Sequence, residues 1–479
     1  MSQFLAPILR LWGDCPRFVI AATILVVSLG VIAFSSSGFI DQTVFAIDPV
    51  SWIVAAGILA GIGYMLIPAA LPYLETQTNS LYWILATGLI LRLMMMSSPA
   101  TLEIDFYRYL WDGAVINAGF SPYEWSPRQI ISGAGPLALE QLAQSAAGII
   151  EQINYPHLTT IYPPVAEFIF AIINGIKPWD LLTLRLVILL FEIATVVLLF
   201  LVMKKLHRSP VWIVLYWWNP VVIFEFSNAA HMDALLLPFL VGALLLALTA
   251  RTPLLSAICL ALATAIKLWP VLLLPTFIRS ITRVRVLVIV CVGFSIVTMV
   301  LLWPLLSQDF DRNAGLYAFS HSWERNAALF HTLQDGLRAI LDDSGLFNID
   351  SGQLLRLGMG ITIIMIALGL NLRAPASPEA LIRRIIIVIA ALLLLGPTMF
   401  PWYYTWMVPF LALVPIRALL ALSVVLPLYH LQFHPWFLAH NNLFTDIILW
   451  IEQGPVFLLL FIEWRKQKRS TASSLVKSA

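Results

Sequence analysis

The chain has 479 residues, of which 60% are hydrophobic and 11% are charged, and its formal net charge is +2. Soluble domains contain about 45–50% apolar and about 25% charged residues. This composition therefore excludes a water-soluble globular protein and predicts an all-α, polytopic integral membrane protein. The near-neutral charge argues neither for nor against nucleic acid. The sequence shows no nucleic-acid-binding motif, so we expect a lipid bilayer as partner and no nucleic acid.

Apolar runs of about 20 residues, the length that crosses a hydrocarbon core, recur along the chain. The clearest are residues 18–40, 51–71, 181–203, 284–306 and 354–372. Residues 162–176 are shorter and begin with Pro163 and Pro164, which suit a helix start. Residues 253–278 are too short for two full spans, so they form either a tilted pair of short helices or a re-entrant hairpin. We expect about 12–14 transmembrane helices.

Basic residues gather in the short connections between the apolar runs, as with Lys204, Lys205, Arg208 and Arg279. Excess Lys and Arg mark the cytoplasmic side of a membrane. The two long polar connections, residues 101–162 and 307–352, should then face outward.

These patterns divide the chain into five parts. We expect two amino-terminal transmembrane helices in residues 1–80 and a catalytic transmembrane module with the first outer loop (101–162) in residues 81–306. The second outer loop (307–352), carboxy-terminal transmembrane helices (353–464) and a basic cytoplasmic tail (465–479) follow. The sequence has no GxxxxGK loop and no HExxH helix, and its three cysteines predict no metal site.

The first outer loop contains the most informative stretch, EIDFYRYLWDGAVINAGFSPY, at residues 103–123. If it is helical up to a stop near Gly119, Asp105, Arg108, Tyr109 and Asp112 share one face. Such a face is either a salt-bridge network at the outer surface or a site. In a site, one carboxylate could take a proton from an acceptor hydroxyl as a general base.

The string DFYRYLWDG at 105–113, followed by GFSPY at 119–123 and INYPHLTTIYPP at 153–164, resembles the first outer loop of GT-C glycosyltransferases. The similarity is greatest to bacterial polyprenol-phosphate-mannose-dependent mannosyltransferases. It covers roughly residues 85–435 and continues through WNP (218–220), AHMDA (230–234), AIKLWP (265–270), WERN (323–326) and PWYY (401–404).

This resemblance implies transfer of a hexose, expected to be mannose, from a polyprenyl-phosphate-linked sugar to an extracytoplasmic glycan or glycolipid acceptor, with inversion. It implies a multi-pass protein of the bacterial inner (cytoplasmic) membrane with an outward-facing active site. No cofactor is expected, because the lipid-linked sugar is a substrate. The alternatives are a transporter or flippase of lipid-linked sugars, and a surface-polysaccharide ligase or polymerase.

The resemblance also suggests site residues. Asp105 matches the family's loop carboxylate and is the expected base, while Asp112 could orient Arg108 or bind sugar hydroxyls. For the donor phosphate, Arg108, Arg185, Lys267 and Arg325 are all possible by position, and we favour Lys267 and Arg325. Lys267 lies in an apolar stretch, where an ionisable residue suggests function, although it could instead reach an interface with its charged end.

The remaining expected sugar- or acceptor-binding residues are polar and aromatic: Tyr109, Tyr123, Tyr162, His231, Asp233, Trp323, Asn326, Trp402 and Tyr403. Asp233 precedes the apolar run 234–248 and could equally be a helix cap. Trp402 and Tyr403 could belong to an interfacial aromatic belt. For Glu192, an ion pair between helices is the favoured interpretation.

Overall fold

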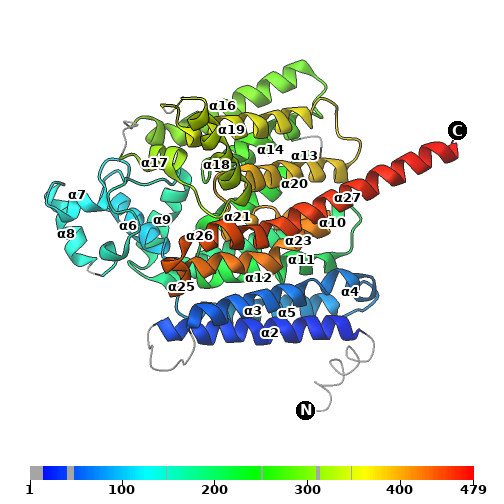
Figure 1. Ribbon diagram of the computed structural model, residues 1–479, viewed down its shortest axis with the longest axis horizontal. Helices are drawn as coiled ribbons and strands as arrows, with labels where there is room; N and C mark the ends of the chain where they lie inside the picture. The colour runs from blue at the N-terminus through cyan, green and yellow to red at the C-terminus, as the bar shows by residue number, and fades with distance from the viewer. Residues whose placement is uncertain are drawn as a thin grey trace, which may run out of the picture.

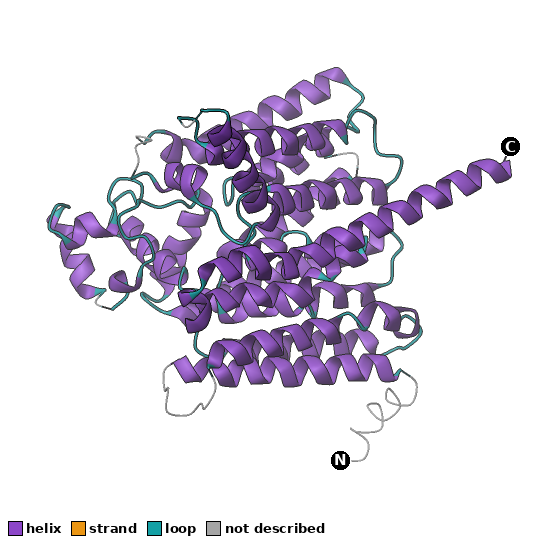
Figure 2. Ribbon diagram, in the orientation of Figure 1, coloured by secondary structure: helices purple, strands orange, loops and turns teal. Residues whose placement is uncertain are grey.

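The computed structural model describes residues 15–39, 48–146, 148–249, 252–308, 313–346 and 348–478. Over these residues it consists of helices and connecting segments without a strand (Figure 2), and the β-bridge between Arg325 and Thr398 is isolated. The predicted all-α class is confirmed.

Six helical segments of the described residues are long and apolar enough to cross a membrane. They are α2 (Pro16–Ser36), α3 with α4 (Pro49–Tyr64 and Ile67–Leu74), α10 (Leu181–Lys205), α16 (Val284–Leu306), α19 (Ser351–Gly369) and a last span, Asn441–Lys466, formed by α26 (Asn441–Leu443), η9 (Phe444–Ile448) and α27 (Leu449–Ser478). The predicted runs fall on the first five, with α16 matching at both ends, while Ile40 lies outside the described residues. Because α16 exposes Val292, Ile296 and Val300, its outer face suits lipid rather than water.

A further apolar segment, either a broken span or a re-entrant loop, is bent in the middle. Helical segments Pro220–Asn228 (α12, Pro220–Ile223, and η5, Phe224–Asn228) and Met232–Ala247 (η6, Met232–Leu236, and α13, Leu237–Ala247) meet at an angle of 109°. Ala230, in the break, has a φ of +59°. The break turns the chain sharply within the helical bundle, so the residues on either side of it contact neighbouring segments.

Shorter apolar helices fill the bundle. They are α5 (Ser80–Met96), α9 (Pro164–Ile176), α14 (Pro253–Thr264), η7 with α15 (Trp269–Leu273 and Leu274–Ile278) and the segment Arg417–Phe433, made of α23 (Arg417–Leu420), α24 (Leu422–Val425) and η8 (Leu426–Phe433). Further helices are η4 (Pro210–Ile213), α11 (Val214–Trp217), α20 (Pro378–Leu395), α21 (Pro401–Tyr404), α22 (Val408–Leu413) and α25 (Pro435–Ala439). Residues 253–278 thus form short helices joined at a break, and the helix start at Pro164 is confirmed. The total of 12–14 crossings stays a prediction.

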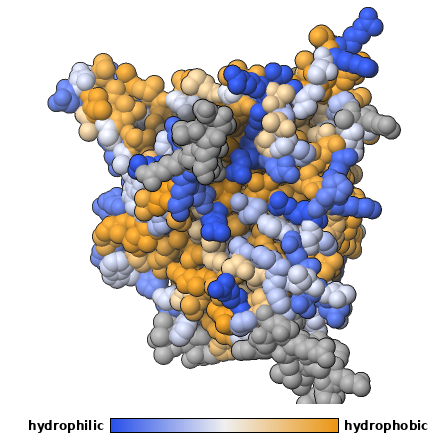
Figure 3. Space-filling view, turned by 90° about the vertical axis from the view of Figure 1, so that its right-hand side faces the viewer, coloured by the Kyte–Doolittle hydropathy of each residue, from blue (hydrophilic) through white to orange (hydrophobic). Residues whose placement is uncertain are grey.

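The helices of the first outer loop gather at one end of the bundle, and α27 projects from the opposite end (Figure 1). The helices of the first outer loop are α6 (Phe106–Asn117), α7 (Pro127–Ile131), α8 (Leu137–Ser145) and η3 (Ile150–Gln152). The second outer loop contributes α17 (Gly315–Ser322) and α18 (Ala328–Asp343). Figure 3 looks onto the opposite end, where hydrophilic residues gather between hydrophobic ones.

Glycines and caps fix the loop helices. Gly119, with a φ of +84°, follows α6 and allows the helix to end as predicted. Gly113 lies so close to α9 that an added Cβ would be 2.3 Å from the Phe170 carbonyl oxygen. The next span begins at Asp180, whose carboxylate accepts a 2.8 Å hydrogen bond from the Thr183 amide. The first outer loop is therefore packed directly against the bundle.

Two buried arginines stabilise the bundle. Arg92 on α5 pairs with Glu192 on α10 at 2.7 Å, both side chains being fully buried, which confirms the ion pair expected for Glu192. Arg185 donates to the carbonyl oxygens of Met96 and Ser98 at 2.7 and 2.9 Å. Arg185 therefore holds backbone in place, where a role in binding donor phosphate had been considered.

Candidate functional site

A cavity of about 600 Å³ lies where both outer loops meet the helix breaks. Ten of the predicted site residues line it: Asp105, Arg108, Tyr109, Tyr162, Asp233, Lys267, Trp323, Arg325, Trp402 and Tyr403. Asp112, Tyr123, His231 and Asn326 are not among its lining residues. The cavity brings together side chains from segments up to 330 residues apart, as Glu103 and Phe433 illustrate.

Asp105 is the residue immediately before α6, and its side chain makes no helix-capping hydrogen bond. Burial raises the pKa of Asp105 to about 6, although the Lys267 ammonium and a hydrogen bond from the Asn154 side chain act in the opposite direction. A carboxylate with this pKa is mostly ionised at neutral pH and still basic enough to accept a proton, which is what a general base requires.

Lys267 lies in the break between α14 and η7, and its Nζ donates to Asp233 Oδ1 at 2.6 Å. The indole N–H of Trp406 donates to the same oxygen, also at 2.6 Å. The ammonium also lies over the ring of Tyr403, 4.2 Å from its centroid. Asp233 is thus an ion-pair partner rather than a helix cap, and Lys267 keeps two N–H groups that can face the cavity.

Arg325 differs from the other cavity cations. Within the described parts of the chain, its guanidinium makes no hydrogen bond or ion pair within bonding distance, and the residue is exposed. Its backbone is fixed, because its N–H donates to the Pro397 carbonyl and its own carbonyl accepts from the Met399 N–H. A fixed backbone with an unpaired guanidinium is a suitable arrangement for an anionic ligand.

Arg108 is already occupied by protein partners. Its Nε is 2.9 Å from both carboxylate oxygens of Asp112, and its Nη atoms donate to the Leu158 carbonyl at 3.1 and 3.2 Å. Asp105 was expected to flank this guanidinium as well, but only Asp112 pairs with it. The two residues therefore connect α6 to the segment that carries Leu158, and Asp112 lies behind the cavity wall.

Two of the three predicted tyrosines line the cavity, and the third supports one of them. Tyr109 and Tyr162 both line the cavity, and their rings meet edge to face with centroids 5.0 Å apart. Phe170 on α9 stacks against Tyr109 at 4.7 Å. Tyr123 is a support, because its hydroxyl donates to the Tyr162 carbonyl at 2.7 Å.

Trp402 lines the cavity with its indole stacked on His231, the centroids being 3.9 Å apart. His231 is fully buried and lies 3.3 Å from the Glu225 carboxylate, so it supports the indole from behind. Asn326 donates to the Met399 carbonyl at 2.9 Å and to Glu452 at 2.7 Å, which fixes the chain next to Arg325. His231 and Asn326 were expected to contact sugar, yet their positions are those of supporting residues.

Sequence reasoning missed several lining residues, among them Glu103, Tyr155, Trp406 and Tyr429. Glu103 accepts a 2.8 Å hydrogen bond from the Tyr429 hydroxyl. Burial and the nearby Asp105 carboxylate raise the pKa of Glu103 to about 8. Its position two residues before Asp105, in an otherwise uncharged entry to the loop, was a signal that could have identified it.

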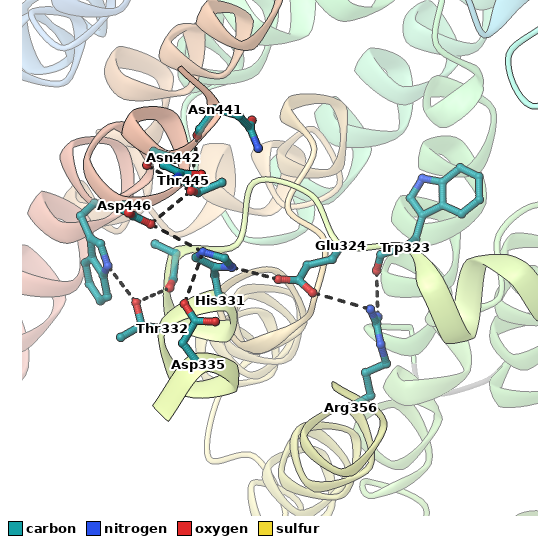
Figure 4. Close-up of polar contacts among 12 residues, drawn as sticks. Trp323, Glu324, His331, Thr332, Asp335, Arg356, Asn441, Asn442, Thr445 and Asp446 are labelled. Atoms are coloured by element: carbon teal, nitrogen blue, oxygen red, sulfur yellow. Dashed lines mark hydrogen bonds and ion pairs between the residues drawn. The ribbon is translucent and has the colours of Figure 1, made fainter. Parts of the chain in front are cut away.

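The second outer loop reaches the cavity through Trp323 and Arg325, and a polar cluster behind them fixes its backbone (Figure 4). Arg356 on α19 donates to the Trp323 carbonyl at 2.8 Å, while the Trp323 ring points away from the cluster. Glu324 lies between Arg356 and His331, 4.0 and 3.3 Å away respectively. These contacts connect α18 and α19 to the segment that presents Arg325.

No group of three or more His, Cys, Asp or Glu side chains in the described residues is arranged to hold a metal ion. The cavity instead combines carboxylates, cations and aromatic rings. Together with the fold, it defines the class: a polytopic helical membrane protein with a polar, aromatic-lined cavity where its two long connections meet the bundle.

Residues 18–283, more than half of the chain, match the family described as alpha-(1->6)-mannopyranosyltransferase, N-terminal domain, and the chain belongs to this family. It is therefore a membrane mannosyltransferase. The same comparisons found no match among curated proteins and none among solved structures.

Proposed function

We propose that the protein transfers mannose from a polyprenyl-phosphate-linked donor to a glycan or glycolipid acceptor at the outer face of a bacterial cytoplasmic membrane. The donor is a substrate and not a cofactor. The observation that supports this most strongly is the cavity itself, where the Asp105 carboxylate shares one space with the Lys267 ammonium and the unpaired Arg325 guanidinium.

The cavity also suits a lipid-linked donor. Part of its lining is aliphatic, including Leu268 beside Lys267 in the break between α14 and η7, and Leu392 and Leu393 on α20. A polyprenyl chain needs an apolar path, whereas the phosphate at its end needs cations. Lys267 lies next in sequence to Leu268, so one segment offers both an apolar surface for the lipid chain and a cation for the phosphate.

The proposed reaction is a direct displacement. The acceptor hydroxyl loses its proton to Asp105 as its oxygen attacks the anomeric carbon of the donor sugar. The bond between that carbon and the phosphate oxygen breaks, and the polyprenyl phosphate leaves with the electron pair. Attack from the opposite face inverts the anomeric configuration, and Arg325 and Lys267 stabilise the negative charge that develops on the phosphate.

The position of the cavity supports an enzyme over a transporter. Residues of both outer loops, such as Tyr162 and Trp323, form much of its wall. Transporters for lipid-linked sugars would place their charged residues around a midplane cavity reached alternately from both sides.

The donor class can be tested with purified protein and radiolabelled mannose donors. We expect transfer from polyprenyl-phosphate mannose and none from a nucleotide-linked mannose. A charged hydrogen bond contributes about 1.5–3 kcal/mol, so Arg325→Gln should raise the donor KM roughly 10- to 100-fold.

Arg338→Gln is the matched control, because Arg338 is exposed on α18 and does not line the cavity. Equal effects of the two substitutions would remove Arg325 from the donor site. Transfer from the nucleotide-linked donor would overturn the proposed donor class.

A further inference from the structure

The segment from Asn154 to Thr159 enters the cavity wall without a part in the proposed displacement. Asn154, Tyr155, Leu158 and Thr159 all line the cavity. Tyr155 has a φ of +51° and is 43% exposed. Left-handed backbone is unfavourable for a bulky residue and is found mainly where the surrounding structure imposes it, often at functional sites.

The Tyr155 ring meets the ring of Trp323, with centroids 4.4 Å apart and planes inclined by 56°. Tyr155 belongs to the first outer loop and Trp323 to the second, and both line the cavity. The two rings therefore form an aromatic pair that connects the outer loops on the cavity side.

The backbone around Tyr155 is held rigidly. The Arg128 amide donates to the Pro156 carbonyl at 2.8 Å, and the Leu158 amide donates to the Tyr155 carbonyl at 3.0 Å. The Leu158 carbonyl accepts from both Nη atoms of Arg108, which Asp112 holds in turn. The Arg108 and Asp112 pair thus connects α6 to the segment that carries Tyr155.

Asp105 is close both to this segment and to Lys267 on the proposed donor side. Asn154, the neighbour of Tyr155, hydrogen-bonds the Asp105 side chain, while Lys267, the neighbour of Leu268, acts on it by charge. A base that joins two substrates must lie between them. Because the aliphatic lining at Leu268, Leu392 and Leu393 suits the donor lipid, we assign the Tyr155 and Trp323 rings to the acceptor.

We propose that Tyr155 and Trp323 form the acceptor subsite, with their rings packed against the C–H face of a neutral hexose. This assignment rests on the proposed function and adds to it the place where the acceptor sugar binds. A hexose presents an apolar ring face and polar edges, so aromatic rings can bind the face while the reacting hydroxyl points to Asp105.

The test is the kinetics of Tyr155→Gly, chosen because glycine adopts a positive φ without strain and removes the ring alone. We expect the acceptor KM to rise roughly 3- to 10-fold, from the contribution of one aromatic contact, with the donor KM unchanged. Tyr155→Phe keeps the ring and should restore the acceptor KM. Trp323→Ala should resemble Tyr155→Gly, and the double variant should lose less than the two effects combined.

Tyr317→Ala is the matched control, because Tyr317 stacks on His321 at 3.9 Å in the same outer loop without lining the cavity. Acceptor binding is measured in parallel by saturation-transfer NMR with a mannose oligosaccharide. If the wild-type protein transfers nothing but Tyr155→Gly loses oligosaccharide binding, the proposed reaction fails and the subsite stands. If Tyr155→Gly changes the donor KM, or leaves both the acceptor KM and oligosaccharide binding unchanged, the subsite assignment is wrong.

Discussion

Asp105 and Glu103 lie two residues apart in the cavity wall, and their pKa values predict different responses when each is replaced by its amide. A carboxyl with a pKa of about 6, as in Asp105, is about 90% ionised at pH 7, whereas one with a pKa of about 8, as in Glu103, is about 90% protonated. Glu103→Gln therefore resembles the native neutral form and should keep most of the turnover. Asp105→Asn removes the base and should lower the rate roughly 100-fold or more with donor binding retained.

The same assignment fixes the pH dependence of the wild-type rate. A general base acts in its deprotonated form, so the rate should level off above about pH 7, be about half-maximal near pH 6 at the pKa of Asp105, and fall by up to about tenfold per pH unit at more acidic pH. Lys267→Gln removes a cation that opposes the rise of this pKa, so the acid limb should move to higher pH.

The assay is the initial rate of mannose transfer from pH 5 to 8 at saturating donor and acceptor. The reasoning is refuted if Asp105→Asn keeps near-normal turnover, or if the wild-type rate at pH 5 equals that at pH 7. The base would then be sought in Glu103 or Asp233, which also line the cavity.

Two further predictions concern support and orientation. Asn228 is fully buried and donates to Ser98 Oγ and the Pro99 carbonyl at 2.7 and 2.8 Å. These two residues come just before the segment that carries Asp105. Asn228→Ala should therefore lower turnover about tenfold with little change in donor KM. Asn371→Ala removes comparable buried bonds, to Thr276 on α15 and to the Ala367 carbonyl near the end of α19. This change should not lower turnover, so an equal loss in both variants would indicate a general stability effect. In a background without native cysteines, a cysteine at Ser126 should react with an impermeant reagent from outside, and one at Lys205 only after lysis; the reverse pattern would invert the orientation.

Local sequence patterns were sufficient to predict the long spans and the helix of the first outer loop. The apolar runs located the long spans because a lipid-crossing helix needs only length and hydrophobicity. The helical spacing in the first outer loop likewise placed Arg108 and Asp112 within reach of each other, and they pair. Which of the two carboxylates on that face enters the cavity did not follow from spacing, and the structure gives Asp105 this place.

Long-range contacts were the part that the sequence did not reveal. Asp233 receives hydrogen bonds from Lys267, 34 residues away, and from Trp406, 173 residues away. No periodicity connects such positions, because the packing of separate helices brings them together. For the same reason His231 could not be recognised as a support for Trp402, since the stacked rings belong to elements that meet only in the folded bundle.

The most direct test of the account is the stereochemistry of the transferred sugar. Purified protein is incubated with polyprenyl-phosphate mannose and a mannose oligosaccharide, and the anomeric configuration of the new bond is determined by NMR. Direct displacement assisted by Asp105 predicts a configuration opposite to that of the donor, with the product greatly reduced for Asp105→Asn. Retention of the donor configuration would contradict the account, as would movement of the intact lipid-linked sugar across a vesicle membrane without product.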